Sequence, residues 1–489
     1  MSSPIIVGVG VAYFAVVAAI GWWASRRVHS ARDFFVAGQR LSLLTLGISS
    51  MAATLSGFAF IGGPGLIYTI GLGAVYIVLP ASITNTMSAW VLAKRLRLLA
   101  EIRPMLTIPD AIGARFASPT AQGLAGLAIV IAVVGYMATN LLALGVILDA
   151  VFAVGRAPAI WIGALVVLAY SVSGGILAGI YNDVFQGALM AIASTLVFGY
   201  ALQAGGGMAG ISHTILQHDP VLLSPWGRLS PLAAMSFFFV FGLGTLGQPH
   251  VIHKFFMLRD PRRLQWFPLV MTVAMTMTLL LFVGVGLVMK ALVLAGVTPP
   301  LRSPDDATPR FLLAFTPQPL AALVFAAVAA AIMSTVNSFL SVGAAALTHD
   351  LPVALGWRVG EELRWGRIWT VILTLAAAAV AQGSTGLVAF LGIFGFGLFA
   401  STLVPSLALG LNWHGATRAG AIASIATGLI GTLLLETMAY AKWFTFPAGV
   451  TAAAVSLVAS LLVFVVVSWL TRDTAADALA PDVRAVLDA

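Results

Sequence analysis

The chain has 489 residues, of which 60% are hydrophobic and only 9% are charged, the composition of a protein that lies mostly inside a lipid bilayer. It contains no cysteine, which excludes disulfide bonds, thiolate metal sites and cysteine nucleophiles. The formal net charge of +8 does not indicate a nucleic-acid partner, because the basic residues lie in separate short loops and not on one face with stacking aromatics.

The first apolar run is followed, and not preceded, by basic residues. It reads MSSPIIVGVGVAYFAVVAAIGWWASRR, whereas a cleaved signal peptide has the reverse order. We therefore predict that it is retained as the first helix of an all-α polytopic membrane protein with a single transmembrane domain, residues 1–489. Apolar runs of about 20 residues predict about 13 transmembrane helices. Their predicted ranges are 3–25, 41–70, 72–93, 120–150, 158–178, 183–204, 231–252, 265–296, 318–348, 367–384, 386–411, 418–438 and 444–471.

The positions of lysine and arginine predict the orientation of these helices. Of the 25 basic residues, 19 lie in the C-terminal tail or in the loops after the first, third, seventh, ninth and eleventh helices, and 6 lie on the opposite side. Cytoplasmic loops carry the excess of Lys and Arg in membrane proteins. The distribution therefore predicts an N-terminus outside the cell and a C-terminus in the cytoplasm.

Two predicted helices contain glycine and proline residues that disfavour a continuous helix. The helix 41–70 contains TLSGFAFIGGPG, and the helix 231–252 contains GLGTLGQP. Glycine costs about 1 kcal/mol in a helix interior and proline about 3 kcal/mol, and a bilayer tolerates such backbone only where protein or a cavity surrounds it. Each is the first helix in a block of five, helices 2–6 and 7–11, which is typical of transporters with two inverted repeats around a midplane binding site. The alternative is that the small residues only allow close helix packing.

The predicted helix 318–348 carries a polar cluster in the apolar run AAAIMSTVNSFLSVGAAAL. Ser334, Thr335 and Ser338 fall close together on its surface because neighbours on a helix are three and four residues apart. Hydroxyls in hydrocarbon need partners, and neutral oxygens on one face suit a hard monovalent cation that must bind and then leave. The cluster therefore favours a sodium-coupled carrier, although the same hydroxyls could instead bond to carbonyls one turn earlier.

Five stretches of the chain, in their order and spacing, resemble the sodium:solute symporter family, which includes bacterial symporters for proline, pantothenate, sialic acid and sugars. They are RDFFVAGQRLS at 32–42, TLSGFAFIGGPGLIYTIGLG at 54–73, SGGILAGIYNDVFQG at 173–187, GLGTLGQPHVI at 242–252 and AAIMSTVNS at 330–338. The resemblance implies the LeuT-like fold of two inverted five-helix repeats. It also implies a symporter of the bacterial inner membrane, with Na⁺ as the coupling ion and a small-molecule solute. We expect the chain to function in the lipid bilayer as a monomer.

The resemblance implies a sodium site between the helices 41–70 and 318–348. The backbone carbonyls and side-chain hydroxyls of this site belong to Ala52, Leu55, Ala331, Ser334 and Thr335. A broken helix exposes unpaired carbonyls, and hydroxyls complete such an oxygen shell. Thr54 stands where proline-type members carry an aspartate, so one charged contribution is missing here.

A second sodium site is also compatible with the resemblance. Some family members place one between an acidic residue, matched here by Asp183, and polar residues matched by Asn337 and Ser338. The residues themselves leave an alternative, because Asp183 stands at the predicted start of the helix 183–204. Carboxylates are favoured at helix N-termini, so capping explains this residue equally well.

The resemblance places the solute at the two helix breaks. The implied solute-binding residues are Ser56, Gly57, Phe58, Phe241, Thr245, Gln248 and Pro249. Phe241 and Thr245 stand where proline symporters carry Trp and Tyr, while FIGGPG and the YND…QG pattern are closer to the pantothenate branch. The helix 120–150 lacks the arginine with which sialic acid carriers bind a carboxylate. We therefore expect a small amino acid, a monocarboxylate or a pantothenate-like solute.

Other polar groups do not indicate chemistry. His250 and His253, beside Lys254, are expected to be solvated or packed, and the set Thr348-His349-Asp350 is expected at a solvated helix end. An enzyme is not expected, since no catalytic constellation is visible. A symporter-like sensor module without transport is the main alternative, but only about 18 residues follow the last predicted helix, too few for a signalling domain. A channel would need a continuous pore, whereas two broken helices suit alternating access.

Overall fold

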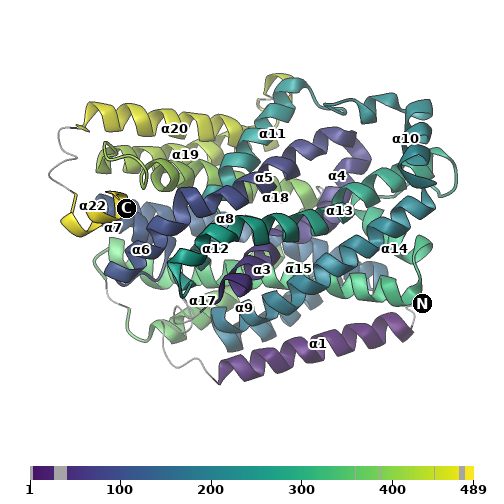
Figure 1. Ribbon diagram of the computed structural model, residues 1–489, viewed down its shortest axis with the longest axis horizontal. Coiled ribbons are helices and arrows are strands. Elements are labelled where there is room, and N and C mark those ends of the chain that lie inside the picture. The colour runs from purple at the N-terminus through teal and green to yellow at the C-terminus, as the bar shows by residue number, and fades with distance from the viewer. Residues whose placement is uncertain are drawn as a thin grey trace.

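The computed structural model of the protein is a bundle of long helices (Figure 1). The description covers residues 4–26, 41–357, 359–384, 386, 388–444, 446–472 and 479–488. Most of the stretch 32–42, and the side chains of residues 172–178, lie outside the described part of the chain.

Within those ranges, 11 helical segments are long and apolar enough to cross a membrane, and two shorter apolar helices accompany them. The membrane helices and their parts are α1 (Pro4–Ser25), α3 (Leu43–Thr54), α4 (Gly63–Ile70), α5 (Val75–Ser88), α8 (Pro119–Phe152), α9 (Arg156–Ala204), α11 (Pro231–Gly244), α12 (Pro249–Ile252), α13 (Phe267–Leu294), α15 (Gln318–Ala345), α17 (Glu362–Gly383), α18 (Val388–Val404), α19 (Arg418–Tyr440) and α20 (Ala452–Leu470). The shorter connecting helices are α6 (Lys94–Ile102), α7 (Ile108–Phe116), α10 (Gly207–His218), α14 (Ala307–Phe315), α16 (Leu351–Ala354) and α22 (Pro481–Asp488). The prediction of an all-α polytopic protein is confirmed.

Both predicted breaks are present, and they have the same local form. The first helix is interrupted after α3, where Leu55 adopts extended angles of φ −90° and ψ 98°. The second is interrupted after α11, where Gln248 adopts φ −81° and ψ 96°. In each case one extended residue ends the helix and the chain resumes helical structure in a new segment. The glycine-rich and proline-containing sequences at these positions explain why the helices stop there.

The segment predicted as the helices 158–178 and 183–204 forms one 49-residue helical segment, α9. A straight helix of that length would extend about 73 Å, more than twice the thickness of the hydrocarbon core. Both ends of α9, however, lie near the C-terminal end of α13: Arg156 pairs with Asp306 in the following loop, and Gly205 packs against Val288. These two contacts show that α9 is not straight over its whole length.

The helix α15 lies at the centre of the bundle. It packs against α1, α3, α8, α9, α12 and α17. Every residue from Val324 to Ala345 is buried, which places the polar cluster of this helix entirely inside the protein. In Figure 1, α1 lies along the lower edge, α19 and α20 form a pair at the upper left, and the chain ends lie at opposite ends of the bundle.

The loop between α13 and α14 is wedged between α4 and α18. The carbonyl of Pro304 lies so close to Gly65 of α4 that a Cβ there would be 2.9 Å from the carbonyl oxygen. The buried carboxylate of Asp305 accepts a hydrogen bond from the Val388 amide at 3.0 Å, at the start of α18. Burial raises the pKa of the Asp305 carboxyl to about 6, against the opposing effects of this amide and of Arg156. The charged form is thus destabilised in the folded protein.

We predict that Asp305→Asn removes a pH dependence of stability. Because the pKa of Asp305 is higher in the folded than in the unfolded protein, this carboxyl contributes most to the stability of the fold below about pH 4. That contribution is lost as the pH rises through 6. The melting temperature of Asp305→Asn relative to that of wild type should therefore rise from pH 4 to pH 7.5. The change corresponds to up to about 3 kcal/mol in the free energy of unfolding. Asp306→Asn, one residue along the chain, is the control. A difference in melting temperature between wild type and Asp305→Asn that stays constant over this pH range would contradict the prediction.

Candidate ion and solute site

The break after α3 redirects backbone groups to side chains. The amide of Gly57 donates to Oδ1 of Asn140 at 2.9 Å, and the amide of Phe58 donates to Oγ of Ser56 at 3.2 Å. The approach of α8 depends on the missing side chain of Gly57, because a Cβ there would lie 2.6 Å from Ala143. In a continuous helix these two amides would bond to carbonyls four residues earlier. The carbonyl oxygens at the end of α3 are therefore left for other partners.

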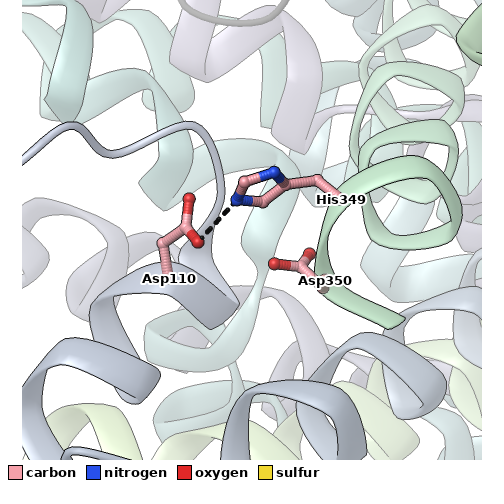
Figure 2. A group of neighbouring side chains, drawn as sticks. All are labelled: Asp110, His349 and Asp350. Atoms are coloured by element: carbon pink, nitrogen blue, oxygen red, sulfur yellow. Dashed lines mark hydrogen bonds and ion pairs between the residues drawn. The ribbon is translucent and has the colours of Figure 1, made fainter. Parts of the chain in front are cut away.

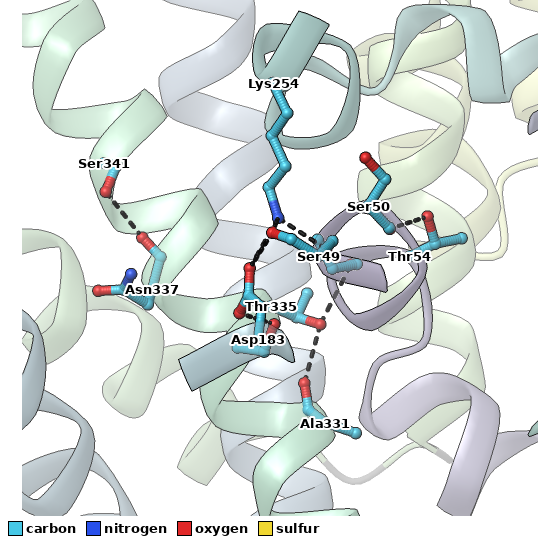
Figure 3. A network of polar contacts seen from close by, with 11 residues as sticks. Ser49, Ser50, Thr54, Asp183, Lys254, Ala331, Thr335, Asn337 and Ser341 are labelled. Atoms are coloured by element: carbon cyan, nitrogen blue, oxygen red, sulfur yellow. Dashed lines mark hydrogen bonds and ion pairs between the residues drawn. The ribbon is translucent and has the colours of Figure 1, made fainter. Parts of the chain in front are cut away.

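The hydroxyl of Thr335 in α15 faces this helix end. Its Oγ1 donates to the carbonyl oxygens of Ala53, at 3.2 Å, and Ala331, at 2.9 Å (Figure 3). The predicted ligands Ala52 and Leu55 lie on either side of Ala53 in the chain and are buried with it. The structure thus brings Thr335 and Ala331 against the broken end of α3, as the sodium-site prediction requires.

The neighbouring hydroxyl, that of Ser334, has a different partner. It donates to Oδ1 of Asp183, while Ser49 in α3 donates to Oδ2 at 2.6 Å. The ammonium of Lys254 lies 2.8 Å from the same Oδ2 and also donates to the carbonyl and hydroxyl oxygens of Ser49, at 2.8 and 2.7 Å. Figure 3 shows the two side chains meeting between the helices. The side chains of Lys254 and Asp183 are 0% and 1% exposed, so this ion pair is fully buried.

Two expectations about these residues were wrong. Asp183 is not a helix cap, because α9 continues through it and its carboxylate bonds to Ser49, Ser334 and Lys254. Lys254, which the sequence placed among the basic residues of a cytoplasmic loop, is buried in the short helical turn after α12. A local sequence pattern does not show that Lys254 pairs with Asp183, which is 71 residues away along the chain.

The other residues named for a second sodium site do not contact Asp183 through the described hydrogen bonds. Asn337 faces α9 at a different place, where a Cβ on Gly179 would lie 2.2 Å from its amide nitrogen. Its amide nitrogen has no hydrogen-bond partner among the residues that the structure describes. Ser338 is buried on the same helix. The second sodium site at these residues stays a prediction.

Aromatic rings from three helices meet beside the two breaks. Phe241 of α11 stacks on Phe396 of α18, with ring centroids 4.4 Å apart, and on Phe58 after the first break, at 5.8 Å. A second group surrounds His250 of α12, whose ring lies 4.0 Å from that of Phe339. The sequence analysis listed Phe58 and Phe241 as solute contacts, but it did not list Phe396 or Phe339, which lie in apolar runs.

Polar groups of the second break lie next to these rings. The side-chain amide of Gln248 donates to the carbonyls of Gly244, at 3.1 Å, and Phe396, at 3.4 Å, while its buried Oε1 has no partner in the described part of the chain. The hydroxyl of Thr245 donates to Gly242 of its own helix at 2.9 Å. Pro249 begins α12 immediately after the break. The free acceptor oxygen of Gln248 is therefore available to a donor group of a solute.

Two groups near the breaks were missed by the sequence analysis. The ring of Tyr136 in α8 lies 4.9 Å from that of Phe339 and 6.4 Å from that of His250, and Asn140, one turn later, accepts the hydrogen bond of the Gly57 amide. The signal for Asn140 was present, because an amide side chain in a long apolar helix requires a partner. His250 is buried and packed, which is one of the two environments that the sequence analysis expected for it.

A separate polar cluster joins α7 to the end of α15 (Figure 2). Nε2 of His349 lies 2.9 Å from Oδ1 of Asp110, and the amide of Gln122 donates to Asp110 at 2.7 Å and to Asp350 at 3.0 Å. Ligand atoms of Asp110, His349 and Asp350 lie within 4.8 Å of one another, a spacing that could accommodate a cation. The expectation that Thr348-His349-Asp350 lies at a solvated helix end was wrong. The helix continues through a π-helical turn to Ala354, and Asp350 is fully buried.

The broken helices and the central helix α15 define a secondary transporter of the LeuT-like class. The fold matches a Na⁺-coupled sialic acid symporter in a substrate-bound outward-open state, with a TM-score of 0.80 at 17% identity over 96% of this chain and 98% of that one. It also matches a nucleobase-cation-symport-1 family transporter, with a TM-score of 0.60 at 13% identity over 94% and 99% of the two chains.

The chain belongs to the sodium:solute symporter family, whose model matches residues 34–428. It is 28% identical to the osmoregulated proline transporter OpuE of Bacillus subtilis, over 96% of both chains. It is 27% identical to the sodium/pantothenate symporter of Escherichia coli, over 88% of this chain and 90% of that one. It is equally identical to the sodium/proline symporter of Staphylococcus aureus, over 86% and 83%. The protein is thus a multi-pass membrane transporter and not an enzyme.

We predict that Asn140→Leu destabilises the break after α3. The change keeps the size of the side chain but leaves the buried amide of Gly57 without its acceptor, a loss that costs about 1–3 kcal/mol. The melting temperature of the purified protein should fall accordingly. Thr139→Val is the matched control, because the Thr139 hydroxyl bonds only weakly, at 3.4 Å, to a carbonyl of its own helix. Equal melting temperatures for the two variants would show that Asn140 does not support the break.

Proposed function

We propose that this transporter couples the import of a small organic solute to sodium through one site at the break of α3. The proposed ligands are the carbonyl oxygens of Ala52, Leu55 and Ala331 and the hydroxyl oxygens of Ser334 and Thr335. The observation that carries the proposal is the contact of the Thr335 hydroxyl with the end of α3, where backbone amides have turned to Asn140 and Ser56.

The chemistry of these groups suits a coupling ion. Neutral carbonyl and hydroxyl oxygens can replace the hydration shell of a monovalent cation without holding it so strongly that it cannot leave. The Thr335 hydroxyl presently donates to Ala53 and Ala331, and rotation about its Cβ–Oγ1 bond would turn its lone pairs toward an ion. Both faces of the site are buried, so sodium would be held away from water during transport.

The proposed solute is a small amino acid, a monocarboxylate or a pantothenate-like molecule. Relatives named for proline and pantothenate transport support this class. The proposed contacts are Ser56, Gly57, Phe58, Phe241, Thr245, Gln248 and Pro249, all of them buried at the two breaks. Aromatic rings would cover the apolar part, Gln248 Oε1 would accept a donor, and backbone amides at the interrupted helices would bind a carboxylate.

The proposed location is the bacterial inner membrane, with the N-terminus outside and the C-terminus in the cytoplasm. The excess of basic residues on one side and the positions of the chain ends at opposite ends of the bundle support this orientation (Figure 1). Because the proposed ligands and solute contacts all come from a single chain, we further propose that a monomer is sufficient for transport.

Thr335→Val should raise the sodium concentration needed for half-maximal stabilisation of the protein. The replacement is nearly isosteric, and loss of one oxygen ligand corresponds to about 1–3 kcal/mol, or a ~5–150-fold weaker affinity. A sodium titration of the melting temperature, with choline holding the ionic strength, measures this shift. Ser341→Ala is the control, because its hydroxyl bonds only to Asn337 of the same helix. An unchanged sodium midpoint in Thr335→Val would move the site elsewhere.

Gln248→Leu should weaken binding of the solute that a thermal-shift screen of amino acids, monocarboxylates and pantothenate identifies. Leucine fills similar space but cannot offer the acceptor oxygen, so the affinity should fall ~5–150-fold. Isothermal titration at saturating sodium gives the comparison. Gln382→Leu, at the exposed end of α17, should bind as wild type does. Wild-type affinity in Gln248→Leu would exclude this side chain from the solute site.

A further inference from the structure

The buried ion pair of Lys254 and Asp183 lies where a cation would be expected. Asp183 supplies a carboxylate, Ser334 and Ser49 supply hydroxyls, and Ser49 adds a carbonyl oxygen. These are the groups that bind monovalent cations in transporters. The centre of this oxygen cluster holds the terminal nitrogen of Lys254 (Figure 3).

The hydrogen bonds of this nitrogen match the donor set of an ammonium. It donates to three acceptors, Oδ2 of Asp183 and both oxygens of Ser49, at 2.7 to 2.8 Å. An ammonium has three N–H groups and no lone pair, so all its donors are satisfied. The side chain of Lys254 is 0% exposed, and water does not compete for these bonds.

The ammonium and a sodium ion carry the same charge and need the same oxygens. Two positive charges about 3 Å apart in a buried site repel strongly, so one excludes the other. Without a cation, an ionised Asp183 would be a buried carboxylate with no compensating charge, which is a costly state. A positive charge at this position compensates the carboxylate, and the protein carries one on its own chain.

The attachment of Lys254 fixes it there. It follows α12, the second half of one broken helix, and reaches Ser49 in α3, the first half of the other. The two neighbouring backbones are also joined, because the amide of Leu41 donates to Met257 and the amide of Arg259 donates to Leu41, both at 3.0 Å. The lysine thus lies in a segment that is already fastened to the start of α3.

We propose that Lys254 is a tethered cation that takes the place of a second sodium ion at Asp183, so that the transporter binds a single sodium ion, at Thr335. The ion pair is neutral overall and leaves the adjacent Thr335 site free of a net opposing charge. This inference rests on the proposed sodium coupling. It assigns to Lys254 the role of setting the number of coupling ions.

The test counts sodium ions on the purified full-length protein in lipid nanodiscs by equilibrium binding of radioactive sodium, without solute. Wild type should bind one ion per chain. Lys254→Met, close in length but neutral, should bind two, because Asp183 is then open to sodium. Lys254→Arg, which keeps the charge, and the double variant Asp183→Asn/Lys254→Met should each bind one.

The outcomes separate this inference from the proposed function. Two ions on wild type, or a single ion on folded Lys254→Met, would overturn the tethered-cation role while leaving the Thr335 site intact. Adding Thr335→Val to Lys254→Met should leave one ion, at Asp183; no ion on this variant would also overturn the role. No ion on wild type but one on Lys254→Met would contradict the Thr335 site alone.

If Lys254→Met does not fold, the ion counts for wild type and for Asp183→Asn/Lys254→Met decide. A second ion on wild type that the double variant lacks would place sodium at Asp183 and overturn the tethered-cation role.

Discussion

The arrangement of this transporter depends on one constraint: a backbone polar group inside a membrane protein needs a partner. Two helices stop in the middle of the bundle, at Leu55 and at Gln248. Their freed groups are served by side chains of neighbouring helices, as the bond from the Gly57 amide to Asn140 shows. The same freed groups are what an ion or a solute can use, which is why the proposed binding site lies at the breaks.

Charge inside the bundle follows a second rule, that buried charges occur in compensating groups. Asp183 is matched by Lys254, while Asp110 is contacted by His349 and shares the side-chain amide of Gln122 with Asp350. Each group links segments distant in sequence, the first joining α3, α9 and α15, the second joining α7, α8 and the end of α15. Removing one partner of such a group is costly because the remaining charge stays buried. These contacts therefore hold the helices in register around the breaks.

Sequence reasoning identified the breaks and the hydroxyls of α15, because glycine, proline and isolated polar residues are conspicuous in apolar runs. It also identified the family, which the family model confirms over residues 34–428. It did not find the partner of Asp183, since Lys254 looks like any basic residue after a membrane helix. It placed Asp350 in solvent because the sequence does not indicate whether the chain after Ala345 continues as a π-helical turn or leaves the helix as a loop. It divided α9 in two, where helical structure is continuous from Arg156 to Ala204. These features are set by contacts between remote segments, which local patterns do not record.

The most direct test of the central claim is hydrogen–deuterium exchange of the wild-type protein in sodium and in choline, at equal ionic strength. If sodium binds between the α3 break and α15, peptides covering Ala52–Phe58 and Ala331–Ser338 should exchange more slowly in sodium than in choline. Peptides of α19 and α20, which lie apart from α3 and α15 in the bundle, should be unaffected (Figure 1). Unchanged exchange at both the break and α15, or protection confined to other segments, would contradict the account.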